Sequence, residues 1–335
     1  MTTVYGNMTP VQSLRLLVED EISQVPLRTY PMVALLTKRD AYQSELKWTV
    51  NVGGATASGR ATDAANAITA SEDTNVAAIL GIGTRVLGHR FDIVRNDIVQ
   101  ARRTAPGALR NLFQAHVTAA FEVIFTGLNS VLYTGDGLAA SHGVFGLDYI
   151  CDATNASYAG ISSGTYADWE ALDNGNGGTG RNLTRTLLGS HHSGMQRRGA
   201  SFDAIFTTPE LVEKYSELFA SEPSTSVTVA PLGAIDLGFG EVTYRGRPII
   251  ADPACPDNEL YFVNSRKVSL HTFNLADSGP NSVTADAQKT LGINFMVAEI
   301  NNENPHVISF EISCQPQLQV YNRRKDIARL ADINQ

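Results

Sequence analysis

The sequence has few charged residues and few cysteines for its length. Charged residues make up only 18% of the 335 residues, while hydrophobic residues make up 43%, enough for a sizeable core. So few charges favour a surface that is covered by neighbouring subunits or one made of small polar loops. The cysteines lie far apart and form no Cys-x-x-Cys pair, which argues against a disulfide framework or a cysteine zinc site. They are Cys151, Cys255 and Cys314.

The sequence also lacks the segments that direct a chain to a membrane or to nucleic acid. The net charge is -8, and no basic run or aromatic-interleaved basic stripe is present, so sequence-specific nucleic-acid binding is not expected. No stretch approaches the ~18 consecutive apolar residues of a membrane helix. The start, MTTVYGNMTP, has neither the basic nor the apolar region of a signal peptide. We therefore expect a protein that is used without export and has no membrane partner.

The first 100 residues predict an arm followed by an extended hairpin. Residues 11–22 have apolar side chains at helical spacing, and Pro26 and Pro31 then favour an extended chain. Residues 46–52 alternate as a half-exposed strand, and a second extended run is expected at 84–94. Small residues fill the long interval between them. Since an isolated hairpin is marginally stable, its own domain or another subunit must support it.

One long core helix is predicted at 104–133. Pro106 suits its first turn, apolar residues recur at steps of three and four, and Gly135 is placed to end it. After a loop-rich stretch, helices and short strands are mixed, so the predicted fold class is α+β. The expected helices are 182–198 and 209–220, and the expected strands are 202–207, 241–245, 248–251, 259–263, 267–270 and 306–314.

Each candidate catalytic or binding motif lacks a necessary part. Gly175–Gly180 matches GxGxxG, but the residues before it do not look like the strand that a dinucleotide site needs. Ser141-His142 lacks the first glycine of a nucleophile elbow. His191 and His192 are adjacent, so on a helix they cannot share a metal and are expected on a polar face. The sequence thus predicts no catalytic residue, no cofactor and no metal, and hence not an enzyme.

Three stretches carry a resemblance to a known family. The first is the long helix followed by LYTGDGLAASHGVFGLD, with a Gly-Asp-Gly turn and then Gly146-Leu147. The second is DAIFTTPELVEKY, and the third is YRGRPIIADPACPDNELYFVNSRKVSL. In this order and spacing they resemble the major capsid proteins of tailed bacteriophages with the HK97-type fold. The resemblance covers most of the chain.

The resemblance implies a set of domains. Residues 1–40 would be an N-terminal arm and 41–97 an extended loop hairpin that a neighbouring subunit carries. A peripheral domain would comprise 98–184 and 291–335, with the spine helix at 104–133. An axial domain would span 185–290. Some relatives crosslink a loop lysine to a distant asparagine, but 53–75 contain no lysine, so no crosslink is expected.

The resemblance also implies the function and the partners. The chain would self-assemble, as hexamers and pentamers, into an icosahedral shell around the double-stranded DNA of a tailed phage. Portal and scaffolding or decoration proteins would be partners, DNA would be held by non-specific proximity, and the protein would be a virion component assembled in the host cytoplasm. Candidate contacts between subunits are Trp48, Arg60, Asp63, Glu72, Asp73, Arg85, Arg90, Arg102 and Arg103.

Three alternatives stay open. An encapsulin-type nanocompartment shares the fold and would hold protein cargo. A nucleotide-binding enzyme would use the Gly175–Gly180 loop, and another phage structural protein, such as a decoration or tail subunit, would lack the long helix and the split domain.

Overall fold

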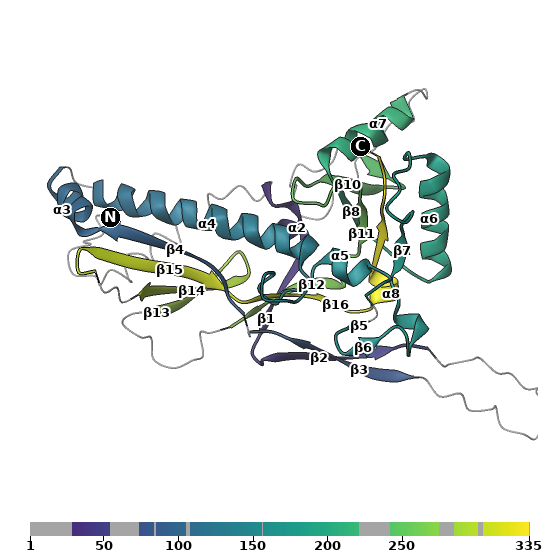
Figure 1. The fold of residues 1–335 in the computed structure, drawn as a ribbon, viewed down its shortest axis with the longest axis horizontal. Helices are drawn as coiled ribbons and strands as arrows, with labels where there is room; N and C mark the ends of the chain where they lie inside the picture. The colour runs from purple at the N-terminus through teal and green to yellow at the C-terminus, as the bar shows by residue number, and fades with distance from the viewer. Residues whose placement is uncertain are drawn as a thin grey trace, which may run out of the picture.

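The fold was obtained as a computed structural model. The structure describes residues 29–53, 74–83, 85–104, 108–155, 157–220, 242–274, 285–300 and 304–334. These residues form an elongated molecule with helices and sheets at both ends (Figure 1). The predicted helix at 11–22 lies outside the described residues.

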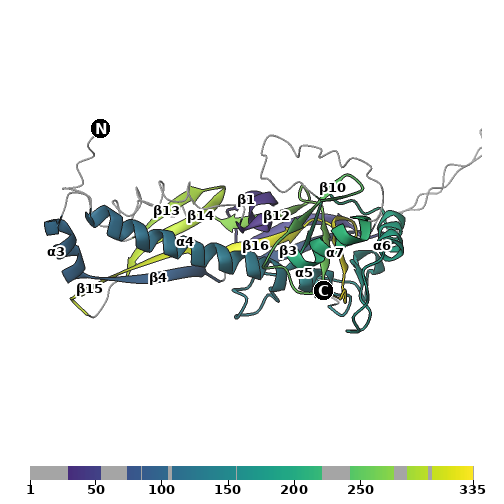
Figure 2. The same cartoon turned by 90° about the horizontal axis from the view of Figure 1, so that it is seen from above.

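A long helix on an antiparallel sheet forms one end of the molecule. Helix α4 (Ala108–Thr134) lies along the sheet, and the short helix α3 (Arg95–Thr104) stands at its far end (Figures 1 and 2). Buried phenylalanines join the two layers: Phe121 and Phe125 on α4 pack edge to face against Phe295 of the sheet. In spatial order the strands are β13 (Ala285–Thr290), β14 (Ile293–Ile300), β15 (Val307–Cys314) and β4 (Leu87–Val94).

The second end is built on a six-stranded sheet. Helix α6 (Arg185–Arg197) packs beside its edge strand, and α7 (Pro209–Ala220) packs against β10. A separate cluster of buried hydrophobic residues fills this end. In spatial order the strands are β7 (Leu172–Asn174), β17 (Ile327–Leu330), β11 (Leu260–Val263), β8 (Ala204–Thr207), β10 (Arg247–Ala251) and β9 (Thr243–Tyr244).

Smaller elements connect the two ends. A three-stranded sheet places β12 (Val268–Phe273) between β1 (Thr37–Ala41) and β16 (Pro316–Val320). Beside it lies the hairpin of β2 (Glu45–Asn51) and β3 (Asn75–Gly81). The remaining short elements are α2 (Pro31–Leu35), α5 (Leu147–Cys151), β5 (Ser157–Tyr158), β6 (Ile161–Ser162), the 3-10 helix η3 (Ala167–Trp169) and α8 (Arg323–Asp326).

Most predicted elements are confirmed, and the α+β class with them. The helix expected at 209–220 is α7, and the late alternating strand is β15. The turn after the long helix is also confirmed. Gly146 donates to Gly135 at 2.7 Å, and a Cβ atom at Gly146 would collide with the carbonyl of Tyr133, so only glycine fits there.

The partner predicted for the first hairpin strand was wrong. β2 pairs with β3, whereas the run expected at 84–94 forms β4 and pairs with β15. Phe91 and Ile93 of β4 are buried beneath α4, so burial draws this strand to the larger sheet. The small residues Ala77 and Ala78 hide the alternation of β3 in the sequence.

Three further predictions need correction. The spine helix was expected from 104, but Thr104 ends a separate helix, α3, and α4 begins at Ala108. The segment 291–335 was assigned to the peripheral domain, yet β17 pairs with β11 and β7 in the other sheet. The strand at 268–273 pairs with β1 and β16 rather than with the strands of the expected axial domain. Strand pairing therefore crosses the predicted division.

Helix α4 is long and apolar enough, from Asn111 to Thr134, to cross a membrane by length and composition alone. Here its apolar face lies on the sheet and belongs to the main core cluster, as expected of the central helix of a domain.

Candidate functional site

The Gly175–Gly180 loop is filled by the chain's own C-terminal segment. The carboxylate of Asp332 accepts hydrogen bonds from the backbone amides of Asn176 and Gly178, the latter at 3.1 Å. A nucleotide phosphate would need those same amides. A strand, β7, does precede this loop, so the reason given against a nucleotide site was wrong. The loop is nevertheless occupied, and its role is to hold the C-terminal segment.

The other candidate motifs also have structural roles. Ser141 donates a short hydrogen bond to Asp136 within the turn that follows α4. The prediction that His191 lies on a polar face was wrong. Its side chain is 1% exposed, and its ring centroid lies 4.8 Å from that of Phe262. Burial lowers the pKa of His191 to about 4, with Arg181 adding to the effect, so the ring is neutral. Among the residues described, no group of three metal-ligating side chains comes together.

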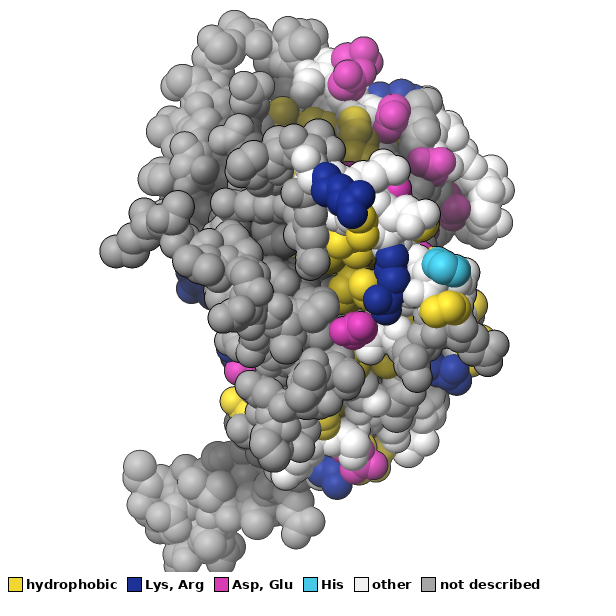
Figure 3. All heavy atoms as spheres, turned by 90° about the vertical axis from the view of Figure 1, so that its left-hand side faces the viewer, with side chains coloured by type: hydrophobic (Ala, Val, Ile, Leu, Met, Phe, Trp, Pro, Cys, Tyr) yellow, Lys and Arg dark blue, Asp and Glu magenta, His cyan; other side chains and the backbone are white. Residues whose placement is uncertain are grey.

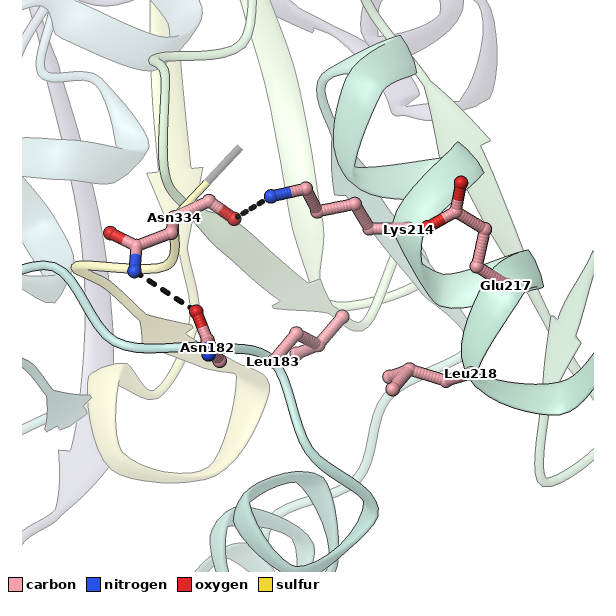
Figure 4. A pocket seen from close by; sticks show the side chains of 6 residues that line it. All are labelled: Asn182, Leu183, Lys214, Glu217, Leu218 and Asn334. Carbon is pink, nitrogen blue, oxygen red and sulfur yellow. Dashed lines mark hydrogen bonds between the residues drawn. The ribbon is translucent and has the colours of Figure 1, made fainter.

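A shallow pocket lies between α7 and the C-terminal segment (Figure 4). The ammonium group of Lys214 donates to the carbonyl of Asn334 at 3.1 Å, and the Asn334 side chain donates to Asn182 at 3.1 Å. Three of its polar residues, Asn182, Lys214 and Asn334, are therefore already joined by hydrogen bonds. Its lining is Asn182, Leu183, Lys214, Glu217, Leu218 and Asn334.

The best-defined polar site is instead a buried carboxylate where the two ends of the molecule meet. Asp252 follows β10 and is 0% exposed. Its oxygens accept from Asn129 Nδ2 at 2.9 and 3.1 Å and from Tyr133 Oη at 2.9 Å, both on α4. The amides of Ala254 and Met32 also donate to it. One carboxylate thus joins the arm, the long helix and the second sheet.

In the described part of the chain, no lysine, arginine or histidine forms an ion pair with this carboxylate. Burial raises the pKa of Asp252, while the hydrogen bonds from Ala254, Tyr133 and Asn129 oppose that change. A buried carboxylate without a full set of donors would be costly, so the four donors are what make this position possible. The arrangement suits mechanical connection and leaves no open face for a ligand.

A second polar cluster lies at the same junction, around Arg329 of β17. Its guanidinium donates to Asp173 at 3.0 and 2.8 Å and pairs with Asp148 of α5. Glu259 lies 3.6 Å from Arg329, and Tyr261 donates a short hydrogen bond to Glu259. Asp152 lies 4.0 Å away as well, so four carboxylates share one cation. Burial opposes the charge of Arg329, but Asp173, Glu259 and Asp148 together raise its pKa, so it stays charged.

The base of the hairpin is held by its own subunit. The indole nitrogen of Trp48 donates to the carbonyl of Tyr321 at 3.0 Å, and the Ile79 amide donates to Ala159 at 2.9 Å. Of the two kinds of support that the sequence left open, the base of the hairpin has that of its own chain, and Trp48 contacts Tyr321 of the same chain.

The residues predicted to contact neighbouring subunits do not form one cluster in the described part of the chain. Arg85 is exposed and lies against the backbone of Gly143, and Arg103 is exposed on α3. Arg90 is tied to its own chain, since it donates to Ser309 at 3.0 Å and pairs with Asp92. The structure gives Arg102 a place on α3 but does not describe its side chain. Outside the described residues lie Arg60, Asp63, Glu72 and Asp73.

The junction residues were not predicted as functional. Asp252 belongs to the Asp-Pro step of PIIADPACPD, a stretch that contributed to the predicted family resemblance but not to any predicted site. Its partner Asn129 lies in the long helix, which was predicted from its apolar residues alone. A polar residue at a core position of a helix was the one signal that could have pointed to a buried partner.

Comparison with known proteins identifies the fold. The chain superposes on a subunit of the cyanophage A-1(L) capsid with a TM-score of 0.76 and 24% identity, over 91% of this chain and 93% of that one. The SrpI encapsulin of Synechococcus elongatus matches with a TM-score of 0.56 and 12% identity, over 100% and 91%. A capsid subunit of a native GTA particle matches with 0.54 and 10%, over 100% and 94%. No protein-family model and no curated protein sequence matches the chain.

These likenesses define the class of structure. The chain has the HK97-type capsid fold, as predicted, with the long α4 as the spine helix. The likeness to the cyanophage capsid subunit extends over nearly the whole of both chains.

The Arg329 cluster makes stability depend on pH. Burial raises the pKa of Glu259 from 4.5 to about 7. The folded state therefore holds this proton more tightly than the unfolded chain, so its contribution is greatest below 4.5 and is lost as pH rises through about 7. We predict that Glu259→Gln, which stays neutral, gains stability relative to the wild type as pH rises, by up to about 3 kcal/mol.

Chemical denaturation over this pH range measures the difference between the two proteins. The exposed Glu213→Gln on α7 is the matched control and should show no such trend. A difference between wild type and Glu259→Gln that stays constant with pH would contradict the assignment.

Proposed function

We propose that the chain is the major capsid protein of a tailed bacteriophage and self-assembles into an icosahedral shell around double-stranded DNA. The observation that carries this proposal is the match to a phage capsid subunit over more than nine-tenths of both chains. The residues described contain no cluster of metal-ligating side chains, and the loop that resembles a nucleotide motif is occupied by Asp332. A structural role accounts for both findings.

The surface supports assembly with copies of the same chain. Large hydrophobic side chains are exposed at both ends of α4: Val94 and Val99 at one end and Leu138, which is 65% exposed, at the other. Figure 3 looks onto the end that carries α3 and shows hydrophobic side chains beside basic and acidic ones. Strands β13 and β4 are sheet edges, which present unpaired backbone groups unless something covers them. Neighbouring subunits would cover such features.

Within this proposal the predicted parts keep their roles. The arm, the extended loop and the peripheral and axial domains would make contacts within and between hexamers and pentamers. Arg60, Asp63, Glu72 and Asp73 would contact neighbours from the hairpin loop, and Arg85 and Arg103 from the exposed surface. Portal, scaffolding or decoration proteins would complete a virion assembled in the host cytoplasm.

The second candidate is an encapsulin-type nanocompartment. The match to the SrpI encapsulin spans the whole of this chain, so the fold accommodates this reading. Its identity and TM-score are both lower than those of the cyanophage capsid, which favours the phage shell. The cargo separates the two candidates, because natural particles with nuclease-resistant DNA would favour a phage, whereas particles with only protein inside would favour an encapsulin.

Assembly is the direct test of the proposed function. The full chain, expressed and concentrated, should form rings, capsomers or closed shells that elute early in size exclusion and appear regular in negative-stain micrographs. Interfaces of this kind bury upwards of ~2,000 Å², so the assemblies should survive dilution. A chain that stays monomeric at every concentration, with or without crowding agents, would overturn the proposal.

Charge reversal in the hairpin loop tests its role in assembly. We predict that Arg60→Glu lowers the yield of particles several-fold and leaves the unfolding midpoint of the subunit unchanged. Each exposed ion pair contributes under ~1 kcal/mol, so the effect arises from many copies acting together. Lys47→Glu makes the same charge change at the base of the hairpin, where Lys47 pairs with Glu45 of its own chain. Equal losses of particles and of subunit stability in Arg60→Glu would refute this role.

A further inference from the structure

The loop between β7 and α6 contains two Asn-Gly steps that the proposed function does not use. They are Asn174-Gly175 and Asn176-Gly177. Such a step can undergo a reaction without any external reagent except water. The backbone nitrogen of the glycine attacks the side-chain carbonyl carbon of the asparagine, ammonia leaves, and a succinimide ring forms. Water then opens the ring on either side, giving aspartate or isoaspartate.

Glycine favours this reaction because it has no Cβ to shield its backbone nitrogen. At Gly177 the surroundings are open as well. A Cβ atom placed there would meet no atom within 4 Å, and φ is +65°. The Gly177 amide donates to no acceptor in the described part of the chain, whereas its neighbours Asn176 and Gly178 both donate to Asp332. The nitrogen that would attack thus makes no hydrogen bond, while the backbone nitrogens on either side of it do.

The side chain that would be attacked reaches across the same turn. Asn176 Nδ2 donates to the carbonyl of Thr179 at 2.8 Å, and the Thr179 amide donates back to the Asn176 carbonyl at 3.3 Å. Asn176 is exposed, so water can reach the ring that forms and ammonia can leave. Ring formation with loss of ammonia and ring opening by water can therefore both take place at this exposed position.

Asn174 is a control provided by the same loop. It ends β7 and pairs with Leu330 in the sheet. The guanidinium of Arg181 donates both to its backbone carbonyl and to its side-chain oxygen, the latter at 3.2 Å. Cyclisation there would need the side chain to leave Arg181 and the backbone to leave the sheet. The two Asn-Gly steps have the same residues, but Asn174 is held by Arg181 and by the sheet.

We propose that Asn176-Gly177 is a site of spontaneous deamidation and isoaspartate formation that weakens the attachment of the C-terminal segment. The geometry that carries it is the free Gly177 amide between two amides bound to Asp332. Aspartate at 176 adds a negative charge beside the Asp332 carboxylate. Isoaspartate also lengthens the backbone by one carbon and displaces the amides from that carboxylate.

The consequence reaches the core because Asp332 is followed by an anchored residue. The Ile333 side chain is 0% exposed in the second core cluster, and its amide donates to Asn258 at 2.9 Å. The Asn334 amide donates to Arg181 at 2.9 Å. The loop and the C-terminal segment thus hold each other, and change in one loosens the other.

Peptide mapping of aged protein tests the proposal. The full chain is kept for several weeks at mildly alkaline pH and physiological temperature, and the conversion of each asparagine amide to a carboxyl is followed by mass spectrometry. Conversion at Asn176 should be at least about tenfold faster than at Asn174, because orientation and freedom control such intramolecular attack. Isoaspartate should be the main product at Asn176. Equal rates at the two steps, or no conversion at Asn176, would overturn the proposal.

Hydrogen exchange tests the structural consequence. In aged protein the amides of Ile333 and Asn334 should exchange several-fold faster than in fresh protein, while those of β14, at the other end of the molecule, stay unchanged. The Asn176→Gln variant, which cannot cyclise readily, should keep its fresh exchange rates after the same ageing. Faster exchange at Ile333 in aged Asn176→Gln would contradict the link between the modification and the C-terminal segment.

Discussion

The buried carboxylate of Asp252 is the interaction on which the arrangement of the two ends depends. Its donors come from three segments that are far apart in the sequence: Met32 in the arm, Asn129 and Tyr133 on α4, and Ala254 beyond β10. Hydrophobic contact alone would let the long helix slide on its neighbours. A carboxylate with no exposure must keep its donors, so it fixes the register of α4 against the second sheet.

Arg329 completes the junction from the other side. It joins β17 to α5 through Asp148 and to β7 through Asp173. The two clusters differ in the charge of the groups that surround the central ion. Asp252 accepts hydrogen bonds from neutral donors alone, whereas the Arg329 cluster places several carboxylates around one cation. Burial raises the pKa of both Asp252 and Glu259, so the strength of both clusters depends on pH.

Local patterns in the sequence were enough to predict most elements and the fold class. The steps of three and four in α4, the Thr208-Pro209 start of α7 and the alternation of β15 each follow from the chain itself. Strand partners could not be predicted, because β2 and β4 both alternate and only tertiary burial decides which pairs with β3 and which with β15. The same holds for His191, whose burial against Phe262 depends on where α6 packs. Asp252 was missed because its side-chain donors, Asn129 and Tyr133, are more than a hundred residues away.

The central claim is that Asp252 couples the arm, the spine helix and the second sheet, and native-state hydrogen exchange of Asp252→Asn tests it most directly. The substitution leaves donors without an acceptor and should cost about 2 to 4 kcal/mol. The account predicts faster exchange in three separate segments at once: 32–36, 129–133 and 252–255. Faster exchange confined to 252–255, with the arm and α4 as protected as in the wild type, would contradict it.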